Sequence, residues 1–206
     1  MVKTTILPAE HPEAIQRAVD IIQRGEPIAF PTDTVYGLGA DAFDAASIKK
    51  LFLVKERTAS RAIPILLGDI DHLSWVTAKM NYLALRLAEV FWPGPLTLVV
   101  PRHMSIPTII SPDETVGLRM PNHAVALTLL RQTGPLAVTS ANISGAPSTR
   151  TGQAVQGQLD VRIPLILDGG RTPGGIPSTV VACTGEQPLI LRDGPISLDD
   201  IKKMLA

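Results

Sequence analysis

Basic side chains gather in one segment of the chain, residues 48–61, with the sequence IKKLFLVKERTASR. Lys55 and Arg57 flank a single acid, Glu56, and Arg61 ends the segment. A lysine ammonium is a compact point charge and an arginine guanidinium is a planar fork of donors, and together they suit the phosphates of a nucleoside triphosphate. A helix face exposed to water would carry the same charges, so this segment alone leaves both interpretations open.

A second segment combines hydroxyl, amide and glycine residues after a predicted strand. Residues 138–148 read VTSANISGAPS. Such loops bind anions and nucleotides through side-chain hydroxyls and exposed backbone N–H groups. Ser140 and Asn142 are equally suited to organising a turn. The segment therefore predicts either a nucleotide-binding loop or a structural turn.

Two further loops carry polar groups next to predicted strands. Residues 168–179, DGGRTPGGIPST, contain four glycines and two prolines, a composition typical of an unusual backbone path, before Ser178 and Thr179 enter a strand. In LRDG, residues 191–194, Arg192 ends a strand and could reach a phosphate or a base. The alternative is a surface ion pair between Arg192 and Asp193.

Several familiar chemistries are disfavoured by spacing. The glycines of GLGADA, residues 37–42, follow the preceding strand at too great a distance for a dinucleotide fingerprint, so they are expected to allow a sharp backbone turn. Neither a Walker motif nor G-x-S-x-G occurs, and the four histidines are too widely spaced to suggest a metal site. Cys183, the single cysteine, lies in VVACTG with no histidine nearby and is expected to be an inert, packed thiol.

Composition bounds the class of protein. The 206 residues are 45% hydrophobic and predict a single domain over residues 1–206. The formal net charge of zero disfavours a protein whose main task is to grip nucleic acid through its phosphates. No signal peptide or membrane-length apolar run is recognised, so a cytoplasmic location and no membrane partner are expected.

Helical and strand patterns alternate along the chain. We predict helices at 12–24, from Asp44 onward, within 69–91, at 123–132 after an Asn122 cap, and to Leu205 after a Ser197–Asp200 capping box. Residues 31–43 are expected to form turns. About seven apolar strands are expected, drawn from 27–30, 63–67, 96–100, 116–120, 135–139, 164–167, 179–182 and 188–191. This alternation predicts an open α/β sheet covered on both faces, with ligands at the strand ends.

Taken together, the motifs resemble those of the YrdC/TsaC family, whose members are L-threonylcarbamoyladenylate synthases. The matching segments are PTDTVYGL (31–38), K-x-R (55–57), FWPGPLTL (91–98), LRMPN (118–122), TSANISG (139–145), PSTVV (177–181) and LRDG (191–194). The resemblance runs through nearly the whole chain in order. It implies an α/β fold with an open, twisted, mixed sheet, helices on both faces and a large concave cavity.

The resemblance also implies a reaction. L-Threonine, bicarbonate or CO2 and ATP would give threonylcarbamoyl-AMP and pyrophosphate, with Mg2+ carried by ATP. A separate threonylcarbamoyl transferase complex would then modify tRNA to N6-threonylcarbamoyladenosine, and a weak direct contact with tRNA is compatible with this role. No resident metal is implied.

Site residues follow from the same resemblance, position by position. Lys55 and Arg57 would be catalytic, holding the phosphates. The remaining ATP or phosphate contacts would come from Arg61, Thr115, Ser140, Asn142, Ser148 and Arg192. Threonine would be bound by Thr34, Tyr36, Arg119, Thr139 and Ser178, with Arg119 on its carboxylate.

This sequence departs from the family pattern in places. Many members read K-G-R-P, whereas here Glu56 separates the two cations and Thr58 and Ala62 replace prolines. Arg61 is expected to replace a neutral ligand, and Leu66 occupies a position where some members have a histidine. The longer members carry an additional C-terminal domain, which the resemblance does not lead us to expect within these 206 residues.

Two other functions remain as alternatives. The basic segment could serve a non-catalytic RNA-binding module, although the neutral net charge and scarce aromatics weaken that interpretation. A related enzyme that adenylates a carbamoyl group from carbamoyl phosphate would be expected to bring zinc-binding and acylphosphatase-like domains, for which this chain lacks length and cysteines.

Overall fold

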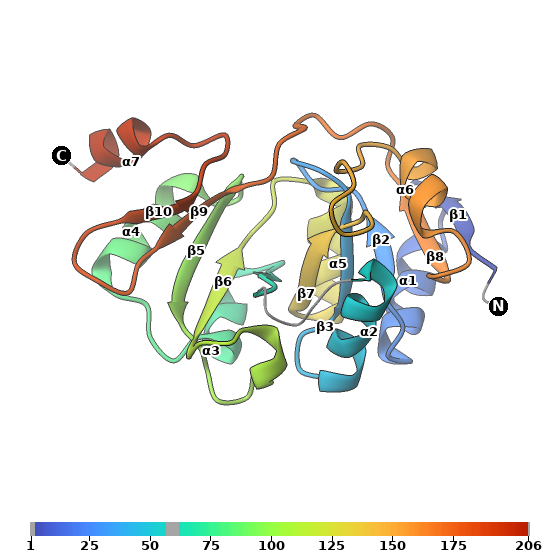
Figure 1. The fold of residues 1–206 in the computed structure, drawn as a ribbon, viewed down its shortest axis with the longest axis horizontal. Helices are drawn as coiled ribbons and strands as arrows, with labels where there is room; N and C mark the ends of the chain where they lie inside the picture. The colour runs from blue at the N-terminus through green and yellow to red at the C-terminus, as the bar shows by residue number, and fades with distance from the viewer. Residues whose placement is uncertain (1–2, 57–61, 206) are drawn as a thin grey trace.

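The computed structural model describes residues 3–56 and 62–205. In this part of the chain, ten strands form one sheet in the order β1-β8-β2-β3-β7-β4-β6-β5-β9-β10 (Figure 1). The strands are β1 Thr5–Pro8, β2 Ile28–Phe30, β3 Gly37–Asp41, β4 Ile65–Leu66, β5 Leu96–Pro101, β6 Thr115–Arg119, β7 Leu136–Ser140, β8 Leu165–Asp168, β9 Thr179–Ala182 and β10 Leu189–Arg192.

Parallel and antiparallel pairs are mixed in this sheet. β4 is parallel to β6 and antiparallel to β7, and so joins the two halves of the sheet through only two residues. On one side β3 pairs with β2 and β7, and on the other β5 pairs with β6 and β9. The short β4 thus lies at the centre of the sheet, where loops from both halves meet.

Helices cover both faces. They are α1 Ala14–Gln23, α2 Ala45–Lys55, α3 Leu73–Val76, α4 Tyr82–Phe91, α5 Ala124–Thr133, α6 Gly152–Leu159 and α7 Leu198–Leu205, with short 3-10 turns at Ile70–His72 and Thr108–Ile110. α1 and α5 contact each other and close one apolar cluster against β2, β7 and β8. α2, α4, α6 and α7 contribute to a second, larger cluster. The predicted fold class, an open mixed α/β sheet with helices on both faces, is confirmed.

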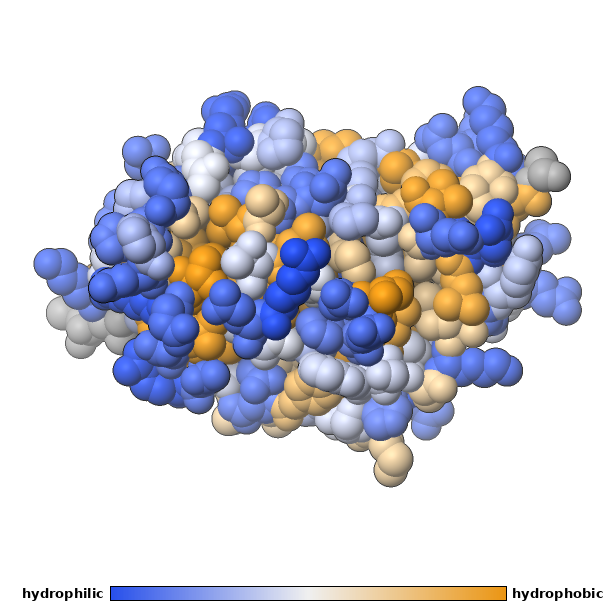
Figure 2. Space-filling view, turned by 180° about the vertical axis from the view of Figure 1, so that it is seen from behind, coloured by the Kyte–Doolittle hydropathy of each residue, from blue (hydrophilic) through white to orange (hydrophobic). Residues whose placement is uncertain are grey.

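Most of the buried hydrophobic side chains lie in these two clusters. The view from behind shows hydrophilic side chains over much of the surface, with hydrophobic groups gathered between them (Figure 2). α4 exposes Tyr82, Leu85 and Val90 on its outer side. No helix in the part of the chain that the structure describes is both long and apolar enough to span a bilayer.

The prediction of turns over residues 31–43 is wrong for the second half of that segment, because Gly37–Asp41 forms strand β3. A Cβ at Gly37 would lie 2.7 Å from Val138 Cγ1, and one at Gly39 would lie 2.8 Å from Phe30 Cε1. The glycines therefore let neighbouring side chains pack onto the strand. This explains their spacing without a dinucleotide site.

Other boundaries differ in detail. Strand β1 and helix α6 were not predicted, and α6 begins after Thr151, whose Oγ1 accepts a hydrogen bond from Ala154 N at 3.2 Å. Asn122 does not cap α5, since that helix begins after His123 without a side-chain cap. The Ser197–Asp200 capping box is confirmed, with Asp200 N donating to Ser197 Oγ at 3.1 Å and Ser197 N to Asp200 Oδ2 at 3.0 Å.

Asp44 caps α2, the helix that carries Lys55 at its end. Its carboxylate accepts from the Ser47 hydroxyl and from Ala46 N, and these bonds hold the pKa of Asp44 below its usual value. Asp44 therefore binds a proton more tightly in the unfolded chain than in the folded protein. The stability that this cap contributes is fully present above the pKa that Asp44 has in the unfolded chain, and it is lost as the pH falls through the lower pKa of the folded protein.

We expect Asp44→Ala to lower the free energy of unfolding by about 1 kcal/mol at neutral pH. The difference from the wild type should shrink below roughly pH 4. Denaturant unfolding at pH 7 and pH 3 measures both quantities, with Asp113→Ala on the exposed surface as the control. An equal loss at both pH values would contradict the assigned cap.

Candidate active site

A cavity of about 360 Å³ lies beside β4, with walls from both halves of the sheet. Its volume falls in the range of small-molecule sites. Most of the predicted site residues line it, namely Thr34, Tyr36, Lys55, Arg119, Thr139, Ser140, Asn142, Ser178 and Arg192. Segments more than 150 residues apart in sequence thus meet at one site.

Four predicted site residues are not among these. Arg57 and Arg61 lie outside the described residues. Thr115 pairs with Pro101 at the opposite end of β6 from Arg119, roughly 13 Å away at strand spacing, and does not line the cavity. Ser148 is partly buried in the loop before α6 and is likewise absent from the cavity wall.

Lys55 joins the end of α2 to the loop that follows β7. Its side chain is 3% exposed, and its ammonium donates to the backbone oxygens of Ser140 and Asn142 and, at 3.3 Å, to Asn142 Oδ1. Ser144 N donates in return to Lys55 O at 3.0 Å. The alternative of a water-exposed helix face is therefore wrong for Lys55, which is a buried cation at the cavity wall.

Asn142 fulfils the turn-organising role that was one of its two predicted interpretations. Its amide nitrogen donates to Ile143 O at 2.8 Å and to Ala146 O at 2.7 Å, which folds residues 142–146 into a tight loop. Its amide oxygen accepts from Lys55. The same side chain therefore shapes the loop and fixes the cation beside it.

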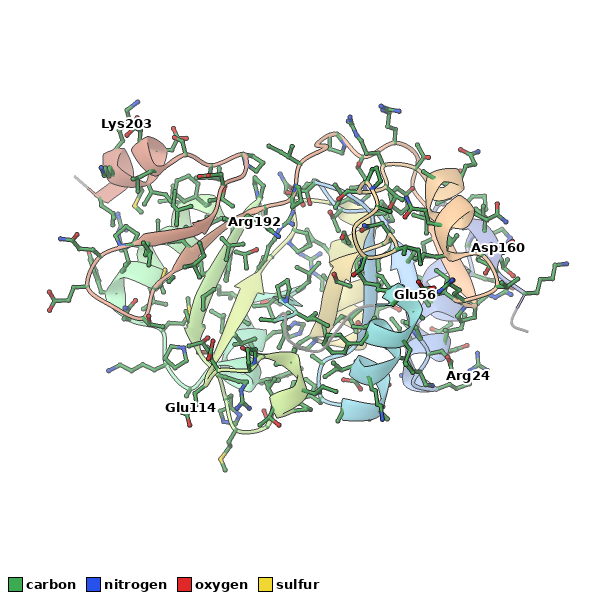
Figure 3. The ribbon with its side chains drawn as sticks, viewed as in Figure 1. Arg24, Glu56, Glu114, Asp160, Arg192 and Lys203 are labelled. Atoms are coloured by element: carbon green, nitrogen blue, oxygen red, sulfur yellow. The ribbon has the colours of Figure 1, made fainter. Side chains whose placement is uncertain are left out.

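Glu56 points away from the site despite following Lys55 directly. It ends α2 in the left-handed conformation, with φ of 53°, and its carboxylate forms an ion pair of 2.7 Å with Arg162. Figure 3 shows Glu56 between α2 and the end of α6. Glu56 does not line the cavity, so this departure from the family pattern places no acid beside the Lys55 ammonium.

Arg119 is the buried cation at the other side of the cavity. It is 5% exposed, its Nε donates to Gly94 O at 2.9 Å, and its Nη1 donates to Thr34 Oγ1 at 3.1 Å. Its Nη2 forms an ion pair with Asp33. Burial lowers the pKa of Arg119, and the nearby charge of Asp33 opposes that shift. The site holds this guanidinium in one fixed orientation.

Arg192 approaches the same space from β10 (Figure 3). Its guanidinium donates to Ser178 O at 2.8 and 3.1 Å and to Ser178 Oγ at 3.2 Å, while Ser178 Oγ lies 2.8 Å from Thr97 Oγ1. Within residues 3–56 and 62–205 it forms no ion pair with Asp193, so that alternative is not observed. Burial lowers the pKa of Arg192.

Tyr36 lines the cavity, and its hydroxyl contacts the loop after β8. The oxygen lies 2.9 Å from Asp168 Oδ1 and 2.7 Å from Gly170 O, and burial, aided by Asp168, raises the pKa of Tyr36. It thereby anchors the glycine-rich loop of residues 168–175. Leu66, 3% exposed, adds an apolar patch to the wall.

Charge at the described cavity wall comes from three cations, Lys55, Arg119 and Arg192. Asp33, which forms an ion pair with Arg119, does not line the cavity. Across the described ranges, no three His, Cys, Asp or Glu side chains lie together in a way that could hold a metal ion. Three cations at its wall make the cavity suited to an anionic ligand.

Two residues that matter here were not singled out from the sequence. Asp33 holds Arg119, and Thr97 holds Ser178. Asp33 is an acid inside the conspicuous PTDT motif, which is a usable signal. Thr97 lies within an apolar strand run, where a single threonine gives no such signal.

Cys183 lies outside this chemistry. Its thiol is 1% exposed, and burial raises its pKa to about 12, so the reactive thiolate is scarce at neutral pH.

We expect a thiol-alkylating reagent to leave the native protein unmodified and to label it after denaturation. Labelling of the native protein at the same rate as of the denatured protein would contradict the buried position of this thiol.

Comparison with known proteins agrees with the motif pattern. The Sua5/YciO/YrdC family model, described as "Telomere recombination", matches residues 20–194. A threonylcarbamoyl-AMP synthase of Bacillus subtilis is 39% identical over 194 residues, covering 93% of this chain and 56% of the relative. A putative threonylcarbamoyl-AMP synthase of Mycobacterium tuberculosis is 39% identical over 199 residues, covering 96% of this chain and 92% of that protein.

A solved structure shares the architecture. The crystal structure of Pyrococcus abyssi Sua5 complexed with L-threonine superposes with a TM-score of 0.91 at 38% identity, covering 100% of this chain and 61% of that one. This chain spans little more than half the length of the Bacillus and Pyrococcus relatives, 56% and 57%. With the family model matched over most of its length and the same fold and motifs present, the chain belongs to the Sua5/YciO/YrdC family.

Proposed function

We propose that this protein is a threonylcarbamoyl-AMP synthase, a nucleotidyltransferase that converts L-threonine, bicarbonate or CO2 and ATP to threonylcarbamoyl-AMP and pyrophosphate. The observation that carries the proposal is the single cavity with Arg119 and Thr34 on one part of its wall and Lys55, Ser140 and Asn142 on another. The names of the relatives and the threonine complex of Pyrococcus abyssi Sua5 support the same activity.

The chemistry follows in two steps. The amine of threonine adds to CO2 and loses a proton, which gives a carbamate. A carbamate oxygen then forms a bond to the α-phosphorus of ATP, while the bond from that phosphorus to the pyrophosphate oxygen breaks. Phosphoryl transfer of this kind depends mainly on positioning and on neutralising charge, so it needs no side-chain nucleophile.

Each cation has a role in this scheme. Arg119, with Thr34 beside it, binds the carboxylate of threonine. Leu66 and Thr139 line the same pocket. Lys55 and Arg192 offset the charge of the phosphates, and Ser140, Asn142 and Ser178 order the groups around them. Arg57, Arg61, Thr115 and Ser148 remain proposed contacts of ATP.

Lys55 acts chiefly through its fixed charge. Its ammonium already donates to oxygens of the loop after β7, so in this state it raises the positive potential of the phosphate region while it holds that loop in place. Mg2+ enters as part of the substrate, bound to the triphosphate, since Mg2+ commonly binds phosphates with few protein ligands. We place the enzyme in the cytoplasm, where a separate transferase complex would pass the threonylcarbamoyl group to tRNA.

The test measures the release of pyrophosphate from Mg·ATP in the presence of bicarbonate. It compares three reactions, which contain threonine, serine or no amino acid. The proposal predicts release that depends on threonine and an adenylate of matching mass. Release with carbamoyl phosphate in place of bicarbonate and threonine would favour the carbamoyl-phosphate alternative. Salt-sensitive RNA binding without any release would favour the RNA-binding alternative.

A further inference from the structure

The ion pair of Asp33 and Arg119 lies at the boundary of the cavity. Arg119 lines the cavity, whereas Asp33 does not. The side chains are 7% exposed for Arg119 and 12% for Asp33. Removing a guanidinium from water to this extent is costly unless an opposite charge and further acceptors surround it. Asp33 supplies that charge from behind the wall.

Protein acceptors take only some of the donors of Arg119. A guanidinium has five N–H groups in a fixed plane. Gly94 O, Thr34 Oγ1 and the Asp33 carboxylate take one each, at Nε, Nη1 and Nη2. These acceptors belong to two separate segments, so the plane of the guanidinium is fixed. One further N–H on each of Nη1 and Nη2 can then serve a ligand in the cavity, which is the arrangement that a carboxylate accepts from an arginine.

Asp33 is itself held from a third segment. Gly174 N donates to Asp33 O at 3.1 Å, and a Cβ at Gly174 would lie 2.7 Å from that oxygen, so the two backbones are in close contact. Arg150 Nη2 donates to Thr172 O at 3.1 Å and to Pro173 O at 3.3 Å and fixes this part of the loop. The glycine-rich segment thus sets the position of Asp33, and Asp33 sets the position of Arg119.

We propose that Asp33 is a positioning residue for recognition of the substrate carboxylate, because it holds the Arg119 guanidinium so that its remaining N–H groups face the cavity. This inference rests on the proposed function. The negative charge of Asp33 also repels a bound carboxylate, and the two effects have opposite signs. Removal of the whole carboxylate frees the guanidinium, whereas replacement by an amide keeps an acceptor in place and removes only the charge.

Asp33→Ala and Asp33→Asn separate these effects. We expect Asp33→Ala to raise the KM for threonine at least about tenfold, as for the loss of one partner of a buried charge pair, with the KM for ATP nearly unchanged. Asp33→Asn should show a smaller rise in the same constant, because its Oδ1 can still accept from Nη2. The control is Glu26→Ala, which removes the acid of the 2.7 Å ion pair with Lys50 away from the cavity.

The readout is steady-state pyrophosphate release over ranges of threonine and ATP, together with thermal unfolding of each variant. An unchanged or lower threonine KM in Asp33→Ala, or in Asp33→Asn if the alanine variant does not fold, overturns the inference. Equal rises in the KM for threonine and ATP overturn it as well, because they indicate a general disturbance. A wild-type protein without threonine-dependent release would instead refute the proposed function, so the two failures are distinguishable.

Discussion

Lys55→Met is expected to reduce threonine-dependent pyrophosphate release by roughly a hundredfold, the effect of losing one strong electrostatic contact in a transition state. Methionine keeps much of the aliphatic length but removes the charge and all donors. Because the Lys55 ammonium is bonded to the backbone oxygens of Ser140 and Asn142, the loop after β7 loses its anchor as well as its cation. Activity should therefore fall mainly in kcat.

The same substitution should also destabilise the fold. The structure places the Lys55 ammonium in a buried network of oxygen acceptors. Each buried acceptor left without a donor costs about 1–3 kcal/mol. Thermal unfolding measured beside the activity assay separates the two consequences. If turnover of folded Lys55→Met equals that of the wild type, the assigned role is wrong.

Lys50→Met is the matched control for this experiment. Lys50 lies on the same helix, and its ammonium forms a partly exposed ion pair of 2.7 Å with Glu26 and a hydrogen bond of 2.8 Å to Gly25 O. It does not line the cavity. Surface ion pairs contribute about 0–1 kcal/mol, so Lys50→Met should lose little stability and keep its turnover.

The second large effect is expected at Arg119. Arg119→Lys keeps a positive charge but loses the planar fork that reaches Gly94 O, Thr34 Oγ1 and Asp33 together. A lysine cannot present two parallel N–H groups to a carboxylate, so the KM for threonine should rise roughly tenfold to a hundredfold. The KM for ATP should change much less, and initial rates at varied threonine and ATP measure both constants.

Arg131→Lys provides the control for that substitution. Arg131 lies on α5, its Nε donates to Gly68 O at 3.1 Å, and it does not line the cavity. It therefore tests the same chemical change in a purely structural setting. A threonine KM in Arg119→Lys equal to that in Arg131→Lys would show that Arg119 does not bind the substrate carboxylate.

Much of the fold could be predicted from apolar patterns, and the exceptions have physical causes. Strands such as Leu96–Pro101 and Leu165–Asp168 are apolar runs buried on both faces, which the sequence displays directly. Strand β3, GLGAD, has the composition of a turn, yet it pairs with β2 and β7, and the side chains of Phe30 and Val138 pack onto its glycines. That packing depends on tertiary neighbours and is invisible in local sequence.

The sequence predicted which residues line the site better than it predicted the hydrogen bonds and ion pairs among them. Motif resemblance identified Lys55, Arg119 and Asn142, although they lie on separate elements. It did not give the acceptors of the Lys55 ammonium, because they depend on how α2 packs beside the loop after β7. It did not give the ion pair of Arg119 with Asp33 either, because that pair depends on how β4 joins the halves of the sheet. Charge pattern alone could not decide whether Lys55 faces water, since α2 shows no clear apolar stripe around it.

We propose that one cavity joins threonine, an inorganic carbon unit and the adenylyl group of ATP. The most direct measurement is the mass of the product formed from threonine, ATP and 13C-labelled bicarbonate. We expect an adenylate that contains threonine and carries the heavy carbon, formed together with pyrophosphate. An adenylate without the label, or no adenylate while ATP and threonine bind, would contradict it.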